Sequence, residues 1–506
     1  MRIHTYFQGI GCAFTLFLLA CGDSSTAAGG SGPTAGAAEG GSPSIGGAGG
    51  GEAGAPPQGG AGGEAEGGGG SAPILPNCEP ATSGEISETC GVFVQPGAEA
   101  GDGSQAAPYG SLAAAVAAVG PATFYVCGNG IVESVTVGAG DSVFGGLDCS
   151  WSWGSAELVW TANEGEVPLK IAGNGSASVV KLVGLAIEAP NPSAIGPIEK
   201  RSSVGIIAES ATVELERVTV QAAAGLDGLK GINGVTPADA GNGTIGILLN
   251  TGSGPVGGTS PCGRTGGHGG SILNFGLITF QGGGDGVLVG AGGDGISVVD
   301  GEDPDCQGDN GANVSNAADA SDAMGLGQLT SAGFVGTNGA DGAVGPHGNG
   351  GGGGGARNLS YVNNVTGSAG GGGGCGGTGG VGGAAGGASI AIISIQSSWT
   401  FTDVSLEVAG GGDGGDGGLG AQGSEAGIGV IPGFWTAAEY PCKGGNGSAG
   451  GDGGDAGGGT GGHAILIAYT GATPDLTSVT TVMPTQAGSG GDAASDGVAA
   501  LMQQFP

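Results

Sequence analysis

The stretch SVGIIAESATVELERVTVQAAAGLDG, residues 203–228, recurs without a gap as SIAIISIQSSWTFTDVSLEVAGGGDG at residues 389–414. A weaker copy begins at Ala464. In the first copy, alternate positions such as Val218 and Val220 are apolar and the residues between them are polar. This period of two predicts β-strands with one dry face. A repeat of this kind cannot bury its dry face alone, so we expect the copies to stack into a solenoid.

Long glycine tracts separate the copies of this repeat, and in three of them glycine falls at every third residue, except at Ala456. The three tracts cover residues 367–382, 411–423 and 444–462. A period of three is that of a polyproline II-type helix, in which residues without side chains allow close backbone approach. Two interpretations are open. The tracts form helices that pack side by side through backbone hydrogen bonds, or they are flexible loops, because ordering glycine costs much conformational entropy.

The composition separates this chain from disordered, collagenous and ordinary enzyme sequences. Of 506 residues, 128 are glycine, yet 38% of the chain is hydrophobic, which is too much for a charged disordered protein. With 24 prolines the chain has too little proline for collagen. Only 5% of its residues are aromatic and 11% charged, which is unusual for a compact enzyme of this length.

The charge balance limits the classes of partner. Ten Lys and Arg residues against 44 Asp and Glu residues give a net charge of −34. Such a chain lacks the basic patch that neutralises phosphates, so we exclude nucleic acid as a partner. The acidic surface favours solubility, and it is also able to collect cations.

The N-terminus is typical of an export signal. Arg2 precedes an apolar run over residues 10–20, which is too short to span a bilayer. The run ends in Leu18-Leu19-Ala20-Cys21, which resembles a bacterial lipobox, where the cysteine becomes the acylated N-terminus after cleavage. The resemblance implies a signal peptide over residues 1–20, lipid attachment at Cys21, and an outer-membrane lipoprotein that faces the cell surface or the periplasm. The alternative is an ordinary secretory signal with an accidental cysteine.

Residues 21–77 are rich in Gly, Ala, Ser and Pro and contain almost no large apolar residue, which predicts a disordered tether. After residue 78 the composition changes. Ser111 is a plausible N-cap for an alanine-rich helix that begins at Leu112 and ends before Gly120-Pro121. Short strand patterns follow this helix.

The stretch GDGSQAAPYGSLAAAVAAV and the later FGGL turn resemble the N-terminal cap and first rungs of pectin-lyase-like proteins. This resemblance covers about residues 91–222. It implies an all-β, right-handed parallel β-helix with a short capping helix. The cap and first rungs would occupy residues 78–222. Further rungs, with long glycine-rich insertions of polyglycine II type, would occupy residues 223–506.

Eight cysteines follow the lipid site, an even number that indicates disulfides in an exported chain. They are Cys78, Cys90, Cys127, Cys149, Cys262, Cys306, Cys375 and Cys442. Cys127 and Cys149 are 22 residues apart, close to one β-helix turn, and adjacent rungs lie at a disulfide-compatible distance of about 4.8 Å. We therefore predict this pair, and also Cys78–Cys90, Cys262–Cys306 and Cys375–Cys442. The absence of CxxC pairs argues against a zinc site.

Calcium is the cofactor hypothesis that the sequence raises, although our prediction is that the chain needs no cofactor. The Gly-Gly-Asp positions Asp413, Asp416, Asp452 and Asp455 lack the nine-residue calcium-binding pattern. A second candidate is the acidic cluster Asp300, Glu302, Asp303, Asp305 and Asp309. Hard cations bind several oxygen ligands on a flexible loop. The alternative, a solvated acidic loop, is favoured because no EF-hand spacing is present.

The fold resemblance also raises polysaccharide cleavage. Enzymes of this architecture place a basic residue near clustered carboxylates, for which the candidates are Lys170, Lys181, Arg217, Glu188, Glu214 and Glu216. A surface ion pair is the simpler interpretation of Arg217 beside Glu216. Trp151, Trp153 and Trp160 suit stacking on sugars if exposed, but we interpret them as core. His268, His347 and His463 read as loop residues without partners.

These observations favour a lipid-anchored cell-surface protein with a structural or adhesive role and no catalytic activity of its own. Its expected partners are the membrane, through the lipid, and a surface glycan or matrix protein. The alternative is a β-helix protein that binds or cleaves polysaccharide, by a lyase or hydrolase reaction. A fold alone does not establish an activity.

Overall fold

The computed structural model describes residues 78–79, 85–99, 101–154, 156–248, 252–274, 278–287, 306–360, 363–430, 441–482 and 486–506. All of these residues belong to one compact unit, Pro73–Pro506. The predicted signal, Cys21 and the tether lie outside the described residues. The regular structure of the described part is mostly β-strand. It also contains one α-helix, α1 (Leu112–Ala118), and two 3-10 helices, η2 (Glu88–Cys90) and η3 (Ile198–Arg201).

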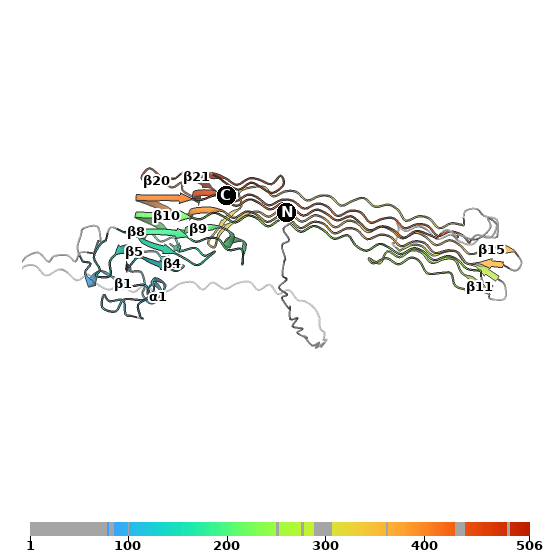
Figure 1. Ribbon diagram of the computed structural model, residues 1–506, viewed down its shortest axis with the longest axis horizontal. Helices are drawn as coiled ribbons and strands as arrows, with labels where there is room; N and C mark the ends of the chain where they lie inside the picture. Colours follow the sequence, from blue (N-terminus) through green and yellow to red (C-terminus); the bar gives the residue numbers. More distant parts are fainter. Residues whose placement is uncertain are drawn as a thin grey trace, which may run out of the picture. The chain divides into compact units, whose positions relative to one another are not determined.

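The larger of two parallel sheets has nine strands (Figure 1). Its path is β1 (Val92–Val94), β2 (Thr123–Cys127), β5 (Ser142–Leu147), β8 (Val179–Ala189), β10 (Thr212–Ala222), β18 (Ser398–Val408) and β20 (Val479–Thr481). Beside this path, β6 (Leu158–Thr161) pairs with β3 (Gly130–Val132) and with β8. We call this the large sheet. The all-β class that the sequence predicts is confirmed.

The second parallel sheet, which we call the small sheet, has six strands. In order across the sheet they are β21 (Ala499–Gln504), β19 (Ala464–Thr470), β17 (Ser389–Ile395), β9 (Ser203–Glu209), β7 (Leu169–Ala172) and β4 (Val135–Gly138). Three antiparallel pairs complete the described strands: β11 (Ile272–Asn274) with β12 (Ile278–Phe280), β13 (Gln328–Thr330) with β14 (Gly333–Val335), and β15 (Arg357–Ser360) with β16 (Asn363–Val365).

The sequence repeat corresponds to strands that lie side by side in register. Val218 in β10 pairs with Val404 in β18, and Val220 pairs with Leu406. All four side chains are buried, as the period-two pattern predicts. Their apolar faces meet residues of the small sheet in one core cluster. Burial of apolar surface is therefore what holds the two sheets together.

A column of left-handed backbone positions crosses the large sheet. Gly184, Arg217 and Asp403 have φ values of 67°, 53° and 54°, and they occupy equivalent positions in β8, β10 and β18. A left-handed conformation costs a non-glycine residue about 1–2 kcal/mol. Its recurrence in neighbouring strands shows that all three strands bend at the same level. The sequence repeat preserves this bend although the residue type changes.

The alanine-rich helix lies where the sequence predicts it. The Ser111 side chain accepts a hydrogen bond from the amide of Ala114, so it caps α1. Leu112 and Ala115 are buried against the strands that follow. The helix therefore covers part of the core next to β1, β2 and β4.

The glycine-rich segments run side by side, away from the sheets (Figure 1). We call the following segments the glycine bundle: 223–248, 252–271, 281–287, 306–327, 336–356, 366–388, 409–430, 441–463 and 486–498. Hydrogen-bonded residues of neighbouring segments advance together by three: Gly225 with Gly410, Gly228 with Asp413, Gly231 with Asp416, and Gly234 with Leu419. Three residues is the period of a polyproline II helix. The ordered interpretation of the tracts is therefore the one that the structure shows.

Segment 366–388 lies in the middle of the bundle. It donates backbone amides to segments on opposite sides, for example from Val381 to Ile232 and from Gly380 to Gly454. A Cβ atom at Gly380 would collide with the carbonyl oxygen of Gly418 in a further neighbouring segment. Because backbone packs directly against backbone, the interior of the bundle has no room for side chains at such positions.

Four disulfides join the described cysteines, and two of them were predicted correctly. Cys78–Cys90 and Cys127–Cys149 form as expected, the second with a Cα separation of 5.0 Å. The predicted pairs Cys262–Cys306 and Cys375–Cys442 are wrong. The structure instead contains Cys262–Cys375 and Cys306–Cys442. The order of cysteines along the chain misleads here, because bundle segments that are distant in sequence lie side by side.

Candidate functional sites

Aspartate and asparagine side chains accept backbone hydrogen bonds between bundle segments. Asp227 Oδ1 accepts the amide of Asp413 at 2.9 Å, and Asp413 Oδ1 accepts the amide of Ser489 at 2.8 Å. Similar bonds cross the bundle at Asn233, Asp239, Asn242, Asn310, Asn316, Asp319, Asp322, Asp341 and Asp455. We call this set the Asx ladder. Many of the acidic residues therefore have a structural role in addition to solvation.

Aspartates that resemble calcium ligands make hydrogen bonds of the same kind. Asp452 Oδ1 accepts the amide of Gly423 at 3.0 Å, while its Oδ2 accepts the side-chain amide of Asn316 at 3.0 Å. Asp455 Oδ1 accepts the amide of Gly420 at 2.7 Å. These carboxylates are occupied by amide donors. Among the described residues, no group of three or more His, Cys, Asp and Glu side chains is arranged to hold a metal ion.

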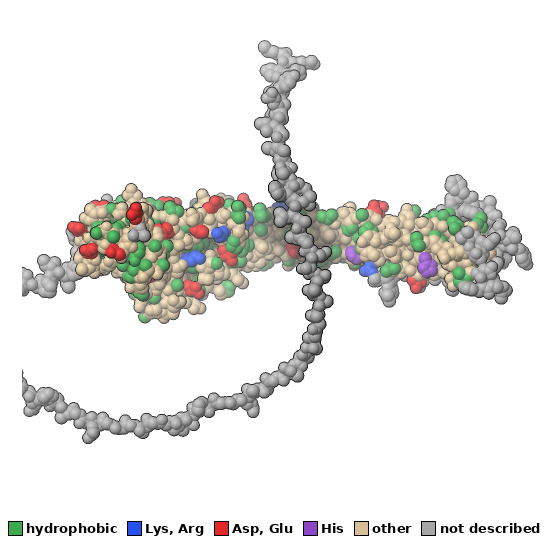
Figure 2. All heavy atoms as spheres, turned by 90° about the horizontal axis from the view of Figure 1, so that it is seen from below, with side chains coloured by type: hydrophobic (Ala, Val, Ile, Leu, Met, Phe, Trp, Pro, Cys, Tyr) green, Lys and Arg blue, Asp and Glu red, His purple; other side chains and the backbone are tan. Residues whose placement is uncertain are grey.

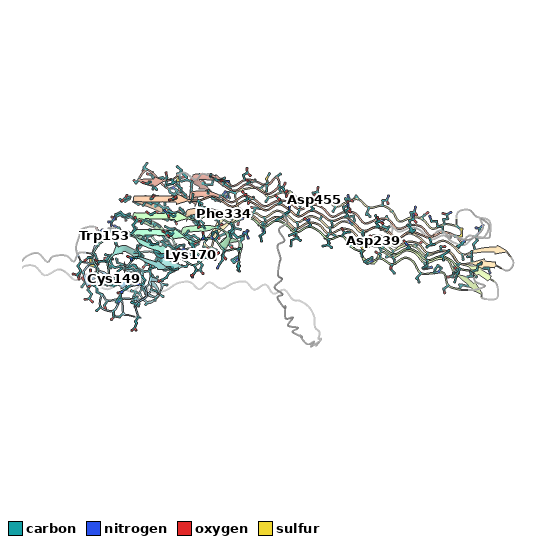
Figure 3. The ribbon with its side chains drawn as sticks, in the orientation of Figure 1. Cys149, Trp153, Lys170, Asp239, Phe334 and Asp455 are labelled. Carbon is teal, nitrogen blue, oxygen red and sulfur yellow. A yellow bond between two sulfur atoms is a disulfide. The ribbon has the colours of Figure 1, made fainter. Side chains whose placement is uncertain are left out.

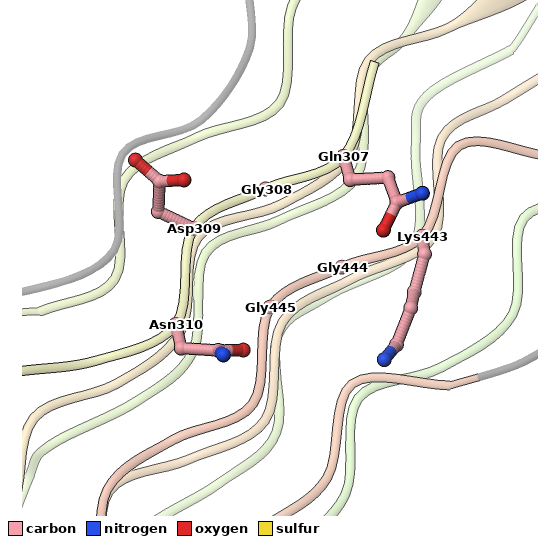
Figure 4. A pocket seen from close by; sticks show the side chains of 7 residues that line it. All are labelled: Gln307, Gly308, Asp309, Asn310, Lys443, Gly444 and Gly445. Carbon is pink, nitrogen blue, oxygen red and sulfur yellow. The ribbon is translucent and has the colours of Figure 1, made fainter. Parts of the chain in front are cut away.

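The second acidic cluster is described only at Asp309, since Asp300, Glu302, Asp303 and Asp305 lie outside the described residues. Asp309 lines a hollow of about 590 Å³ in the bundle, together with Gln307, Asn310, Lys443 and three glycines (Figure 4). Its carboxylate and the Lys443 ammonium extend from different segments and point away from one another in Figure 4. Asn310 Oδ1 accepts the amide of Asn446 at 2.8 Å, so it belongs to the Asx ladder.

The residues proposed for polysaccharide cleavage divide between the two sheets. On the large sheet, Lys181 Nζ lies 3.7 Å from Glu214 and 3.3 Å from Glu216. Burial lowers the pKa of Lys181, but the hydrogen bond to Glu216 and the charge of Glu214 outweigh it and raise the pKa overall. Glu188 lies farther along β8, beside Gln221 of β10, and Lys170 lies on the small sheet. The six candidates are therefore not one constellation.

Arg217 packs on Trp153 rather than pointing into a cleft. Its guanidinium carbon is 4.2 Å from the Trp153 ring centroid, and its Nη2 is 3.7 Å from Glu216. Such cation–π contacts contribute about 0.5–1 kcal/mol at exposed sites. Nearby Glu157 was missed by sequence reasoning. Burial raises its pKa, although a hydrogen bond with Thr219 opposes the shift.

Two of the three clustered tryptophans are core residues, as predicted. Trp160 is fully buried, and its Nε1 donates to the Glu133 carbonyl at 2.9 Å. Trp151 is 5% exposed and lies edge-on to Phe93, with ring centroids 4.7 Å apart. Trp153 is only partly buried and lies under Arg217 (Figure 3 labels Trp153).

The prediction that the histidines are loop residues without partners is wrong for His463. Its Nδ1 accepts the Val498 amide at 2.9 Å and its Nε2 donates to the Leu326 carbonyl at 2.7 Å. The ring also lies edge-on to Phe334 and Phe505. Burial lowers the pKa of His463, and the bond to Leu326 opposes this shift. A neutral imidazole fits this pair of bonds, because one nitrogen accepts and the other donates.

The other two histidines also have hydrogen-bond partners. His347 Nδ1 accepts the amide of Gly376 at 2.9 Å, so the prediction is wrong there as well. His268 Nδ1 lies 3.1 Å from the carbonyl oxygen of Gly269. His347 belongs to the bundle framework, since its ring satisfies a backbone amide of the central segment.

One groove brings together basic and acidic side chains on the small-sheet side. It has a volume of about 410 Å³ and is lined by Ser134, Gly165, Glu166, Val167, Lys170, Pro197, Glu199, Lys200, Ser202 and Ala332. The residues come from the position before β4, from β7 and the loop before it, from η3 and its flanks, and from the turn between β13 and β14. Figure 3 labels Lys170 near these elements. Sequence reasoning singled out Lys170 but missed Lys200, Glu166 and Glu199, which only the fold brings near it.

Comparisons with protein-family models, with curated proteins and with solved structures found no match. No helix within the described ranges is long and apolar enough to cross a membrane.

Proposed function

We propose that this protein is a lipid-anchored cell-surface protein with a structural or adhesive role and no catalytic activity of its own. In this proposal the glycine bundle is a stiff arm that is inserted between rungs of the sheet region. The bundle supports the proposal because it is ordered by its own backbone hydrogen bonds and by the Asx ladder. A framework of this kind holds exposed side chains at fixed spacing without enclosing a catalytic cleft.

We further propose that the two sheets are faces of a right-handed parallel β-helix of the pectin-lyase-like type. Support comes from the order of the strands. A strand of the small sheet is followed along the chain by a strand of the large sheet five times, at β4–β5, β7–β8, β9–β10, β17–β18 and β19–β20. The glycine segments leave after the second strand of such a pair and return before the next. This arrangement is expected when each pair belongs to one rung.

The proposed outer-membrane location depends on Cys21, and Cys12 inside the signal offers a matched control. Cys21→Ser should abolish palmitate labelling and recovery in the membrane fraction. Cys12→Ser changes a cysteine inside the apolar run and should leave both unchanged. Membrane recovery of the Cys21→Ser variant at the level of the unmodified chain would contradict lipid anchoring.

The adhesive role is tested by an in-phase deletion of residues 203–388. This deletion joins Ser202 to Ser389, which occupies the position of Ser203 in the repeat, and removes the first insertion with one pair of strands. Cells that carry the deleted chain should attach less to surfaces and matrix than cells with the full chain, at equal surface abundance. Equal attachment would contradict a role of the bundle in adhesion.

The alternative, a polysaccharide-binding or polysaccharide-cleaving protein, draws its support from the groove on the small-sheet side. Two lysines and two glutamates line it. The large-sheet candidates favour this alternative less, because Lys181 and Arg217 are engaged with Glu214 and Glu216.

A further inference from the structure

One segment of the glycine bundle covers its neighbours along only part of their length. Segment 252–271, which we call the cover segment, contacts both segment 223–248 and the central segment 366–388. The two arms of the cover segment meet at a turn at Cys262, and the disulfide Cys262–Cys375 fastens this turn to the central segment. From Cys375 toward the sheets, the same side of the central segment is exposed in the described chain.

The positions that face the cover segment can be followed along each neighbour, because residues three apart on a polyproline II helix point in the same direction. Under the cover segment these positions are glycine. A Cβ atom at Gly372 would collide with the Thr259 carbonyl oxygen, and one at Gly241 would also contact Thr259. A Cβ atom at Gly350 would collide with the Thr265 carbonyl oxygen. Beyond the cover segment, the positions in phase with these glycines carry large apolar residues: Val381, Val344, Leu229, Ile232 and Val235.

These five residues form an exposed surface, which we call the apolar face. The Val381 amide donates to the Ile232 carbonyl at 2.9 Å, so the segments that carry them are adjacent. Segment 336–356, which carries Val344, bonds to the other side of the central segment. Leu229, Ile232 and Val235 are 67%, 73% and 69% exposed, and Val344 and Val381 are 61% and 46% exposed. Figure 2 shows apolar side chains spaced along the bundle and few basic ones. Exposed apolar surface that spans three segments marks an interaction site.

The backbone donors beside the apolar face already have partners. Under the cover segment, Gly370 donates its amide to a carbonyl of that segment. Beyond it, the equivalent amides of Gly376 and Gly382 donate to His347 Nδ1 at 2.9 Å and to Asp341 Oδ1 at 2.7 Å. A further glycine segment would therefore find these donors occupied and large side chains in its way. The apolar face is a surface of side chains, and its partner must contact it through side chains.

A second copy of the apolar face fits this requirement. Its side chains recur at every third residue, about 9 Å apart along each segment, and the gaps between them accept side chains of a surface with the same spacing. A second copy supplies that spacing, and two identical faces meet through a two-fold axis that covers both. A lipid surface fits less well, because the chain has a net charge of −34 and membranes carry anionic lipids.

The size of the apolar face suits a weak dimer. Residues 226–238 span about 37 Å along a polyproline II helix, and three hydrogen-bonded segments are roughly 15 Å wide. Pairing therefore covers about 1,100 Å² over both copies, which is close to the lower limit of specific interfaces. Attachment of both copies to one membrane would raise their effective concentration and favour the pair.

We propose that the apolar face is a self-association surface, at which two copies of this protein pair face to face along their bundles. The inference deepens the structural role proposed above and rests on it, because pairing joins neighbouring arms at the cell surface. It requires no contribution from the sheets and no bound ligand.

Thiol cross-linking of the full chain on cells tests the pairing. Every described cysteine is in a disulfide, so Ile232→Cys and Val381→Cys each add a free thiol to the described part of the chain. A short bismaleimide should give a band at twice the chain mass for both variants, above the background of the unmodified chain. Leu419→Cys is the matched control and should give only that background. Leu419 is 60% exposed but is in phase with Asp413, whose side chain bonds Ser489 on another side of the bundle.

Sedimentation velocity of the purified full chain in detergent measures the pairing without a cross-linker. Ile232→Glu should weaken the dimer at least about tenfold, because it places a carboxylate of each copy in the interface. Leu419→Glu should leave the dimer unchanged, and circular dichroism confirms that both variants fold. Added salt should strengthen the dimer, since it screens the repulsion between two chains of net charge −34.

The inference is overturned if Leu419→Cys cross-links as strongly as Ile232→Cys, or if the cross-linked bands have a mass other than twice that of the chain. It is also overturned if Ile232→Glu leaves the dimer unchanged or if added salt dissociates it. The deletion of residues 203–388 tests adhesion separately. Reduced attachment of that deletion, with no dimer of the full chain, would refute pairing and leave the adhesive role intact. A dimer of the full chain, with unchanged attachment of the deletion, would refute adhesion alone.

Discussion

The sheet region and the glycine bundle bury their backbones in opposite ways. In the sheets, side chains such as Leu215 and Val220 fill the space between layers, and both are fully buried. In the bundle, a carbonyl of one segment occupies the place where a side chain of the next would stand, as at Gly380 and Gly418. Stability in the first region comes mainly from apolar burial, and in the second from backbone hydrogen bonds and close contact.

This difference shows that a change in the period of the sequence pattern coincides with a change from side-chain packing to backbone packing. The period is two up to Ala222 at the end of β10 and becomes three from Gly225 onward. The same hydrogen-bonding groups serve both regions. Only the presence or absence of side chains decides whether the neighbours approach as a pleated sheet or as a bundle.

Removing a disulfide should have the largest effect on stability, and a larger one in the bundle than in the sheet region. The bundle disulfides close longer loops of chain. Cys306–Cys442 spans 136 residues, whereas Cys78–Cys90 spans 12. In the chain-entropy model the double Cys→Ser change should lower the free energy of unfolding by about 4–5 kcal/mol for the long loop and about 3 kcal/mol for the short one. Chemical denaturation of both variants measures this. A larger loss for the short loop would contradict the view that the bundle depends more on its cross-links.

Gly380→Val tests whether the bundle interior tolerates a side chain. The new Cβ would collide with the Gly418 carbonyl oxygen, which cannot move away without breaking its neighbours' hydrogen bonds. We expect a loss of about 3 kcal/mol in unfolding free energy. Gly120→Ala is the matched control, because no atom lies within 4 Å of a Cβ at Gly120. Equal stability of the two variants in urea denaturation would disprove backbone-to-backbone packing at this position.

The sequence predicted the sheet strands better than the contacts within the bundle. Strand faces follow from the alternation around Val218 and Val220, because burial of a strand residue depends mainly on its own neighbours in the chain. The period of three in the tracts left packed helices and flexible loops both open, and it did not indicate which tracts are adjacent. The disulfides Cys262–Cys375 and Cys306–Cys442 were therefore not predicted. Which segments are adjacent depends on packing among segments that are far apart in sequence.

The candidate sites show the same limit. Lys181, Glu214 and Glu216 stood among six candidates in the sequence, and the structure brings these three together on adjacent strands. The surface ion pair that the sequence suggested, between Arg217 and Glu216, is present at 3.7 Å. Lys200 and Ala332 reach the groove from η3 and from a bundle hairpin. No spacing in the sequence relates these two positions to Lys170. A signal was available only in the scarcity of lysine, which makes every lysine a candidate.

His463 lies where the bundle meets the small sheet, at the residue before β19. Its titration therefore tests how the stability of this boundary depends on pH. Burial lowers its pKa below the ordinary value of 6.5, and therefore the unfolded chain binds the proton more readily than the folded chain. Its contribution to stability is complete above pH 6.5 and is lost as the pH falls from 6.5 through the lower pKa of the folded chain, by at most about 1.4 kcal/mol per pH unit. Thermal unfolding from pH 8 to pH 5 measures the slope.

His463→Gln removes the titrating group and serves as the control for this slope. The variant should lose less stability than the parent chain over the same pH interval, even if it starts from a lower melting temperature. Parallel curves for the two proteins would show that the acid sensitivity has another origin, such as the carboxylates of the Asx ladder.

Asp455 separates the hydrogen-bonding role of the Asx ladder from its charge. Its Oδ1 accepts the Gly420 amide at 2.7 Å. Asp455→Ala should cost about 1 kcal/mol, the typical value of one hydrogen bond, while Asp455→Asn keeps an acceptor oxygen and should cost much less. Urea denaturation compares the two. If asparagine is as damaging as alanine, the charge rather than the acceptor is what the bundle needs at this position.

Lys181→Met on the large sheet should have the smallest effect of the five changes. Lys181 lies between Glu214 and Glu216 but is partly exposed, and solvent and salt screen such pairs, so we expect a change below about 1 kcal/mol. A small effect is expected if the sheets are stabilised mainly by burial of Leu215 and its neighbours on the inner face. A loss as large as that of Gly380→Val, measured by the same urea denaturation, would mean that outer charges hold the sheet as strongly as backbone contacts hold the bundle.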